Sequence, residues 1–92
     1  MSTVQVSLPT PLRPLAGQQR TVAVEGATVG EALTALVTQY PALKPQLYND
    51  RGQLKNFVNL FLNGENIRLL QGEATPVKPS DQLQIVPAVA GG

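Results

Sequence analysis

The chain has 92 residues, 42% of them hydrophobic, and its seven basic and six acidic side chains give a net charge of +1. This length fits one domain with a single modest core. The basic residues are dispersed along the chain, which argues against a nucleic-acid surface. No apolar stretch approaches the ~20 residues of a membrane span. The chain has no cysteine and no histidine, which excludes thiol nucleophiles, disulfides, the usual zinc ligands and the commonest general base.

The N-terminal region predicts a hairpin of two strands. Residues 3–8 (TVQVSL) alternate with period two, which places every second side chain from Val4 onward on a buried face. Three prolines lie between residues 9 and 14, and we expect them to hold an extended loop because each fixes φ and lacks an N–H donor. Residues 20–24 then form the second strand, with two inward valines.

One helix is predicted in the middle of the chain. Thr28 and Glu31 match a capping box, in which each side chain accepts a hydrogen bond from a free N–H at the helix start. Apolar residues then recur at the spacing of one helical face: Val29, Ala32, Leu33, Leu36, Val37 and Tyr40. Pro41 ends the helix, and residues 41–49 are expected to add a short helical turn that covers the core edge with Leu43 and Leu47.

Three strands are expected in the C-terminal half. Residues 56–63 alternate, and the pair Asn63-Gly64 predicts a tight type I′ turn into a short strand over residues 65–69. Residues 71–81, with two prolines, are expected to be a loop. The last strand covers residues 82–87, with Leu83 and Ile85 inward.

This order, β-β-α-β-β-β, predicts an α+β protein of the β-grasp (ubiquitin-like) type, in which the helix packs across one face of a mixed five-stranded sheet. Residues 1–87 would form the domain, and residues 88–92 would form a flexible tail that ends in Gly91-Gly92.

A terminal diglycine places a carboxylate on a very slim segment, because glycine has no Cβ. Five extended residues reach roughly 17 Å, which is enough to enter a partner's pocket. The alternative is an ordinary frayed chain end.

The body of the protein is poorly equipped for catalysis. Its carboxylates are dispersed along the chain, at Glu25, Glu31, Asp50, Glu65, Glu73 and Asp81. No Gly-rich phosphate-binding loop is present. We therefore expect no catalytic residue and no metal site, and the protein to take part in chemistry as a substrate.

Three segments resemble the ubiquitin-like sulfur carriers of the MoaD/ThiS type: residues 57–64 (FVNLFLNG), Ile67-Arg68 and residues 81–92 (DQLQIVPAVAGG). That family includes the small subunit of molybdopterin synthase, the sulfur carrier of thiamine biosynthesis and a carrier for cysteine biosynthesis. Residues 4–13 (VQVSLPTPLR) and the PAVAGG ending are most similar to the cysteine-pathway carriers.

The resemblance implies that an activating enzyme, an adenylyltransferase and sulfurtransferase, uses ATP to adenylate the carboxylate of Gly92. Sulfur then displaces AMP to give a thiocarboxylate. Gly91 would fit the narrow channel of that enzyme, and Ala88, Val89 and Ala90 would form the arm. The chain would bind no cofactor of its own, since ATP is held by the activating enzyme.

The resemblance and the strand pattern also indicate a docking surface. Phe57, Phe61 and Val86 are predicted on the sheet face away from the helix, where a small exposed apolar patch commonly marks an interface. Alternatively, Phe57 lies under the proline-rich loop or against Leu54. Arg68 would be solvated or would pair with an acidic partner. Two tyrosines are expected at the core edge: Tyr40 and Tyr48.

For the downstream pathway, similarity to the cysteine-pathway carriers implies a pyridoxal-phosphate cysteine synthase as sulfur acceptor and a zinc-dependent peptidase that releases the product. A molybdopterin role stays open; the thiamine carriers are usually shorter. Two other classes also stay open, a modifier conjugated to other proteins through Gly92 and a non-reactive binding module. Without a signal-peptide pattern or membrane span, a cytoplasmic protein is expected.

Overall fold

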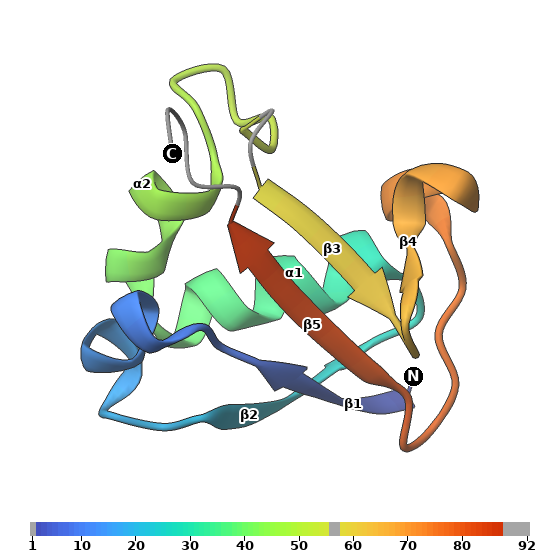
Figure 1. The fold of residues 1–92 in the computed structure, drawn as a ribbon, viewed down its shortest axis with the longest axis horizontal. Helices are drawn as coiled ribbons and strands as arrows, with labels where there is room; N and C mark the ends of the chain where they lie inside the picture. Colours follow the sequence, from blue (N-terminus) through green and yellow to red (C-terminus); the bar gives the residue numbers. More distant parts are fainter. Residues whose placement is uncertain (1, 56–57, 88–92) are drawn as a thin grey trace.

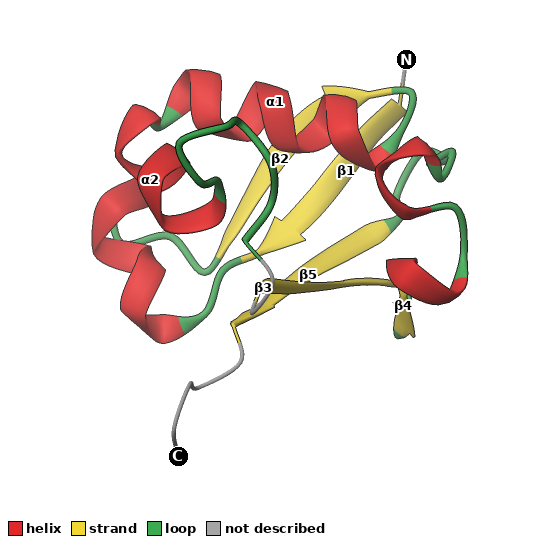
Figure 2. Cartoon of the chain, turned by 90° about the horizontal axis from the view of Figure 1, so that it is seen from above, coloured by secondary structure: helices red, strands yellow, loops and turns green. Residues whose placement is uncertain are grey.

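The structure is a computed structural model that describes residues 2–55 and 58–87, and its strands form one sheet with helices on one side (Figures 1 and 2). The strands and α-helices are β1 (Ser2–Ser7), β2 (Thr21–Gly26), α1 (Val29–Gln39), α2 (Lys44–Leu47), β3 (Val58–Leu62), β4 (Glu65–Asn66) and β5 (Gln82–Pro87). Four 3₁₀ helices lie between them in the described ranges: Thr10–Ala16, Pro41–Leu43, Ile67–Leu69 and Gly72–Ala74.

The sheet has the strand order β2-β1-β5-β3-β4. β1 is antiparallel to β2 and parallel to β5, while β5 is antiparallel to β3. The predicted mixed five-stranded sheet and the β-grasp arrangement are therefore confirmed. β5 is the central strand, so the segment that follows it leaves from the middle of the sheet.

The core lies between α1 and the face of the sheet that the period-two patterns predicted. Val4, Val6 and Leu83 are fully buried, and so are Leu33 and Leu36 of α1. Because alternate strand residues point to opposite faces, one side chain in two enters this core. Leu43 and Leu47 close its edge from the short helices, as expected.

The capping box begins α1 as predicted. The Glu31 N–H donates to Thr28 Oγ1 at 3.2 Å, and the carboxylate oxygen Oε1 of Glu31 accepts from the Ala27 N–H at 3.0 Å. The helix ends at Gln39, because Tyr40 precedes a proline and takes a non-helical conformation with φ −128° and ψ 79°.

The extended loop expected at Pro9, Pro11 and Pro14 is wrong, because residues Thr10–Ala16 form a 3₁₀ helix. The φ that proline imposes lies within the 3₁₀ range, and the missing N–H of Pro11 costs nothing in the first turn. Pro14 lies inside the helix, where its φ still fits although it donates no hydrogen bond. Leu12 and Ala16 of this helix are buried, so the segment covers the end of the core. The pattern of prolines alone did not reveal this burial.

The strand expected over residues 65–69 is also shorter than predicted. The turn at Asn63 and Gly64 has the two positive φ angles expected, 51° and 89°, but β4 ends at Asn66. The Arg68 N–H donates to Asn66 Oδ1 at 2.9 Å, and this local bond starts the 3₁₀ helix Ile67–Leu69. The loop predicted over residues 71–81 contains another 3₁₀ helix, Gly72–Ala74.

Candidate docking face and tail root

Residues 88–92, which carry the predicted thiocarboxylate site Gly92 and its neighbours Gly91, Ala90, Val89 and Ala88, lie outside the described residues, as does Phe57. What the structure defines is the point from which the tail leaves. β5 runs to Pro87 beside β3, where Val58 pairs with Pro87. We call this end of β5 the tail root.

Two of the three predicted docking residues lie where the pattern placed them. The β3–β5 register pairs Asn59 with Val86 and Phe61 with Gln84. Residues directly opposite each other in an antiparallel pair share a face, and the intervening pair Leu60 and Ile85 is buried toward the helix side. Phe61 and Val86 are therefore diagonal neighbours on the outer face, both half-buried.

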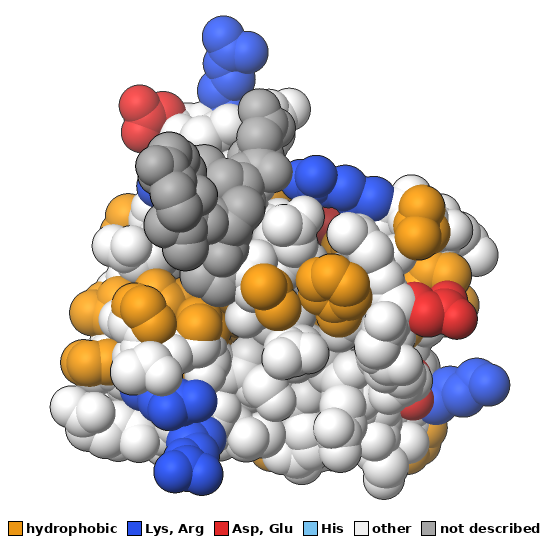
Figure 3. Space-filling model, viewed as in Figure 1, with side chains coloured by type: hydrophobic (Ala, Val, Ile, Leu, Met, Phe, Trp, Pro, Cys, Tyr) orange, Lys and Arg blue, Asp and Glu red, His pale blue; other side chains and the backbone are white. Residues whose placement is uncertain are grey.

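Phe61 and Val86 form a small apolar patch in polar surroundings. Figure 3 shows hydrophobic side chains over β3 and β5 in the middle of a mostly uncharged face. A pocket of about 240 Å³ adjoins this patch and is lined by Ser7, Phe61, Asn63, Gly64, Gln82 and Gln84. A partner docking here would meet apolar contacts and neutral hydrogen-bonding groups. The docking role of the patch stays a prediction.

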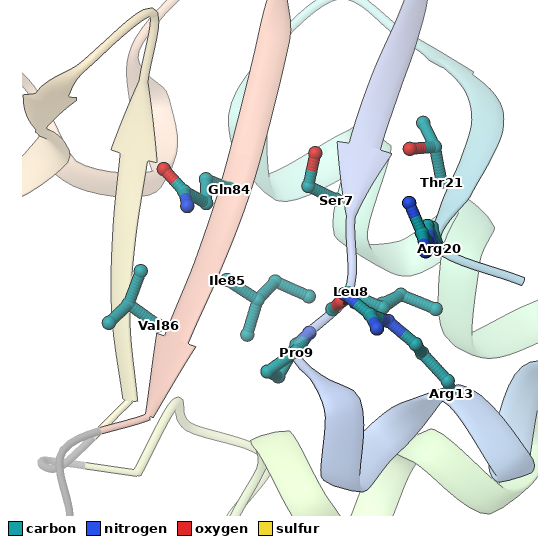
Figure 4. Close-up of a pocket in the computed structure, with 9 residues that line it drawn as sticks. All are labelled: Ser7, Leu8, Pro9, Arg13, Arg20, Thr21, Gln84, Ile85 and Val86. Carbon is teal, nitrogen blue, oxygen red and sulfur yellow. Dashed lines mark hydrogen bonds between the residues drawn. The ribbon is translucent and has the colours of Figure 1, made fainter.

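A second pocket at the tail root was not predicted from the sequence. It has a volume of about 420 Å³ and lies where β5 continues past the end of β1. Figure 4 shows Gln84 and Val86 on one side of it, and Leu8, Arg13 and Arg20 on the other. In the sequence, only the positions of Arg13 and Arg20 close to the prolines could have indicated this pocket. The two side chains come together because of the 3₁₀ helix Thr10–Ala16, which was not predicted.

The two tyrosines are core-edge residues, as expected, since both pack against the buried cluster. Partial burial and, to a smaller extent, the nearby negative charge of Glu73 raise the pKa of Tyr48 to about 12. The Tyr40 hydroxyl accepts a hydrogen bond from Gln19 Nε2. These contacts stabilise the fold on the side of the sheet opposite to Phe61 and Val86.

Within residues 2–55 and 58–87, no cluster of three acidic side chains is arranged to hold a metal ion. None of the helices in those ranges is long and apolar enough to cross a membrane. Asp81 makes local hydrogen bonds instead: its carboxylate accepts from Asn63 Nδ2 at 3.1 Å and from the Lys78 N–H at 2.8 Å. These bonds fix the start of β5 against the β3–β4 turn.

A helix across a mixed sheet, with a central last strand leading into a diglycine segment, defines the class of ubiquitin-like proteins. The sequence model of the ThiS family matches residues 6–92. The chain therefore belongs to the ThiS family, the ubiquitin-like sulfur carriers.

Individual relatives agree with this assignment. The sulfur carrier protein CysO of Mycobacterium tuberculosis is 40% identical over 91 residues, which cover 97% of this chain and 98% of CysO. Small archaeal modifier protein 1 of Haloferax volcanii is 45% identical over 76 residues, covering 79% of this chain and 83% of the modifier. The crystal structure of the BexX/CysO complex of Amycolatopsis orientalis contains a chain that superposes with a TM-score of 0.87 at 38% identity, covering 97% of this chain and 99% of that chain.

Proposed function

We propose that this protein carries sulfur on Gly92 for partner enzymes. The observation that supports this most directly is the extent of the family match, which continues through residues 91 and 92. A likeness restricted to the body would support the fold only, whereas a likeness that includes the diglycine supports the chemistry of the tail.

In the proposed reaction, the Gly92 carboxylate attacks the α-phosphate of ATP, and pyrophosphate leaves. Sulfide then attacks the acyl carbon, AMP leaves, and a thiocarboxylate remains after loss of the sulfide proton. A free carboxylate is a poor acyl electrophile, and the adenylate supplies the leaving group. This protein contributes no catalytic residue: it presents a carbonyl, and Gly91 keeps the neighbouring backbone slim enough for the enzyme's channel.

The partner that we propose first is an adenylyltransferase of the ubiquitin-activating type. It would bind the patch of Phe61 and Val86, together with Phe57, and receive residues 88–92. The BexX/CysO complex supports a protein partner for a chain of this kind. No cofactor would be bound by the carrier itself, and we propose the cytoplasm, where ATP is available, as its location.

The pathway that we propose is cysteine biosynthesis, because CysO matches nearly the whole chain. The acceptor would be a pyridoxal-phosphate cysteine synthase, and a zinc-dependent peptidase would release the product from the carrier. The putative molybdopterin converting factor subunit of Pyrococcus furiosus is only 21% identical, so that likeness shows the shared fold alone.

A second candidate function is protein modification through Gly92. Small archaeal modifier protein 1 of Haloferax volcanii is the specific reason to keep it, since its 45% identity over 76 residues is higher, over a shorter stretch, than that of CysO. An isopeptide bond to a lysine would use the same adenylated carboxylate, so the two functions differ in the acceptor and not in the carrier.

Intact-mass spectrometry after incubation with ATP, sulfide and the activating enzyme tests the proposal. A mass increase equal to the exchange of one oxygen for sulfur supports the carrier. A ladder of conjugates in cell extract, without that exchange, supports the modifier. An unchanged mass without conjugates would contradict both and leave a non-reactive binding module.

A further inference from the structure

We propose that the pocket at the tail root binds an acidic side chain, Asp or Glu, of the activating enzyme, and so holds that enzyme where residues 88–92 begin. This inference rests on the proposed function and identifies the chemistry of one partner contact. The contact differs in chemistry from the apolar patch, because Arg13 and Arg20 would make it, although Val86 lines both surfaces.

The pocket exists because two parallel strands end at different places. The pairing of β1 with β5 is described only as far as Ser7 and Gln84, while β5 continues to Pro87. After Leu8 the chain turns away at Pro9, whose nitrogen carries no hydrogen for a further ladder bond. Val86 therefore forms one wall, and Ile85 part of the floor, of a hollow of about 420 Å³ without a strand to fill it.

The backbone of Leu8 places both arginines on the opposite wall. The Arg13 Nε–H donates to the Leu8 carbonyl oxygen at 3.1 Å, which fixes the plane of that guanidinium. The Leu8 N–H donates to the Arg20 carbonyl oxygen at 2.8 Å, which holds the start of β2 beside it. Figure 4 shows the two arginines on the Leu8 side of the pocket.

The only charged side chains that the structure describes in the lining of this pocket are positive. Of the described residues that line it, none is acidic. Within residues 2–55 and 58–87 neither Arg13 nor Arg20 forms a salt bridge. Arg13 uses Nε for the Leu8 carbonyl, and its two terminal nitrogens form the fork that pairs with a carboxylate in a bidentate way. Buried Leu8 and Ile85 give the pocket an apolar floor, which strengthens such a pair relative to open solvent.

The position of the pocket indicates which protein supplies the carboxylate. Val86 belongs both to this pocket and to the apolar patch, so one partner surface can cover the two continuously. A protein that takes residues 88–92 into its active site must also approach Pro87 and the wall next to it. The activating enzyme is the first protein to do so in the proposed reaction.

The test compares two variants with the same change in net charge, Arg13→Gln/Arg20→Gln and Lys44→Gln/Lys78→Gln. Both lysines are exposed and lie outside the pocket. The measurement is ATP-dependent pyrophosphate release by the activating enzyme at increasing carrier concentration, at low and at high sodium chloride. Circular dichroism melting checks that each variant folds. Arg20→Gln alone is included because no side-chain hydrogen bond of Arg20 within the described residues would be lost.

We expect the KM for the carrier to be about tenfold higher for Arg13→Gln/Arg20→Gln than for wild type, and about threefold higher for Arg20→Gln alone. The kcat should stay within about twofold of wild type in both variants. Salt should raise the wild-type KM much more than that of the arginine variant, and the lysine pair should behave like wild type. An unchanged KM for the arginine pair, or equal increases for both pairs, would overturn the proposal. A wild-type chain that is never adenylated would overturn the proposed function and this contact with it.

Discussion

The two faces of the sheet carry different kinds of side chain, although they alternate residue by residue along the same strands. On the face toward α1, the buried side chains of β1, β3 and β5 are all apolar and at most 7% exposed. The outer face is mostly polar and uncharged, with Phe61 and Val86 as its half-buried apolar pair. The inner face can thus determine stability while the outer face remains available for partner recognition.

Leu60 and Phe61 are adjacent in β3 but lie on opposite faces of the sheet, so substitutions at these two positions test the difference between the faces directly. Leu60 is 2% exposed on the inner face, so Leu60→Ala should lower the free energy of unfolding by about 2–5 kcal/mol. Phe61→Ala, one residue further on, should cost about 1 kcal/mol and instead raise KM in adenylation. Urea denaturation and pyrophosphate release measure the two effects. Equal losses of stability would show that the outer face belongs to the core.

The contact between β2 and α1 tests the inner side in a different way. A Cβ added at Gly26 would lie 2.6 Å from the Ala32 backbone nitrogen, closer than atoms can approach. Gly26→Ala must therefore move α1 and should cost about 1–3 kcal/mol. The matched control is Glu25→Ala, at the exposed neighbouring position, which should stay within about 0.5 kcal/mol of wild type. Two variants with the same melting temperature would contradict this close packing.

A smaller effect is expected from pH. The folded state raises the pKa of Tyr48 to about 12 from 10.0, so its neutral form is favoured by folding. The corresponding stability is present below pH 10 and is lost as pH rises from 10 to 12. Urea midpoints across this range should fall more steeply for wild type than for Tyr48→Phe. If the urea midpoints of wild type and Tyr48→Phe fall equally with pH, the Tyr48 hydroxyl titrates in the folded protein as it does in the unfolded chain.

Local patterns predicted the fold well because its main elements are locally encoded. The alternation in residues 3–8 and 82–87, the capping box at Thr28 and the turn at Asn63-Gly64 each specify their own backbone. The 3₁₀ helix Thr10–Ala16 was missed because it depends on burying Leu12 and Ala16 in the core and on contacts with the 3₁₀ helix Pro41–Leu43, which is distant in the sequence.

For the same reason, the sequence predicted only part of the candidate site. The face on which Phe61 and Val86 lie followed from period two within single strands. The pocket with Arg13 and Arg20 did not follow, because it depends on the pairing of β1 with β5, whose partners such as Gln5 and Gln82 lie 77 residues apart in the chain. It also depends on how far each strand continues beyond that pairing. Which enzyme binds there is determined by the partner's surface as well.

Mass spectrometry of the C-terminal proteolytic peptide, after reaction with ATP, sulfide and the activating enzyme, identifies the residue that carries the sulfur. Because the chain has no cysteine, a persulfide on a thiol side chain cannot imitate the signal. We predict that the oxygen-to-sulfur exchange maps to Gly92 and disappears in a chain that lacks Gly92 but melts like wild type. Sulfur that maps to any other residue, or that persists after this deletion, would contradict this prediction.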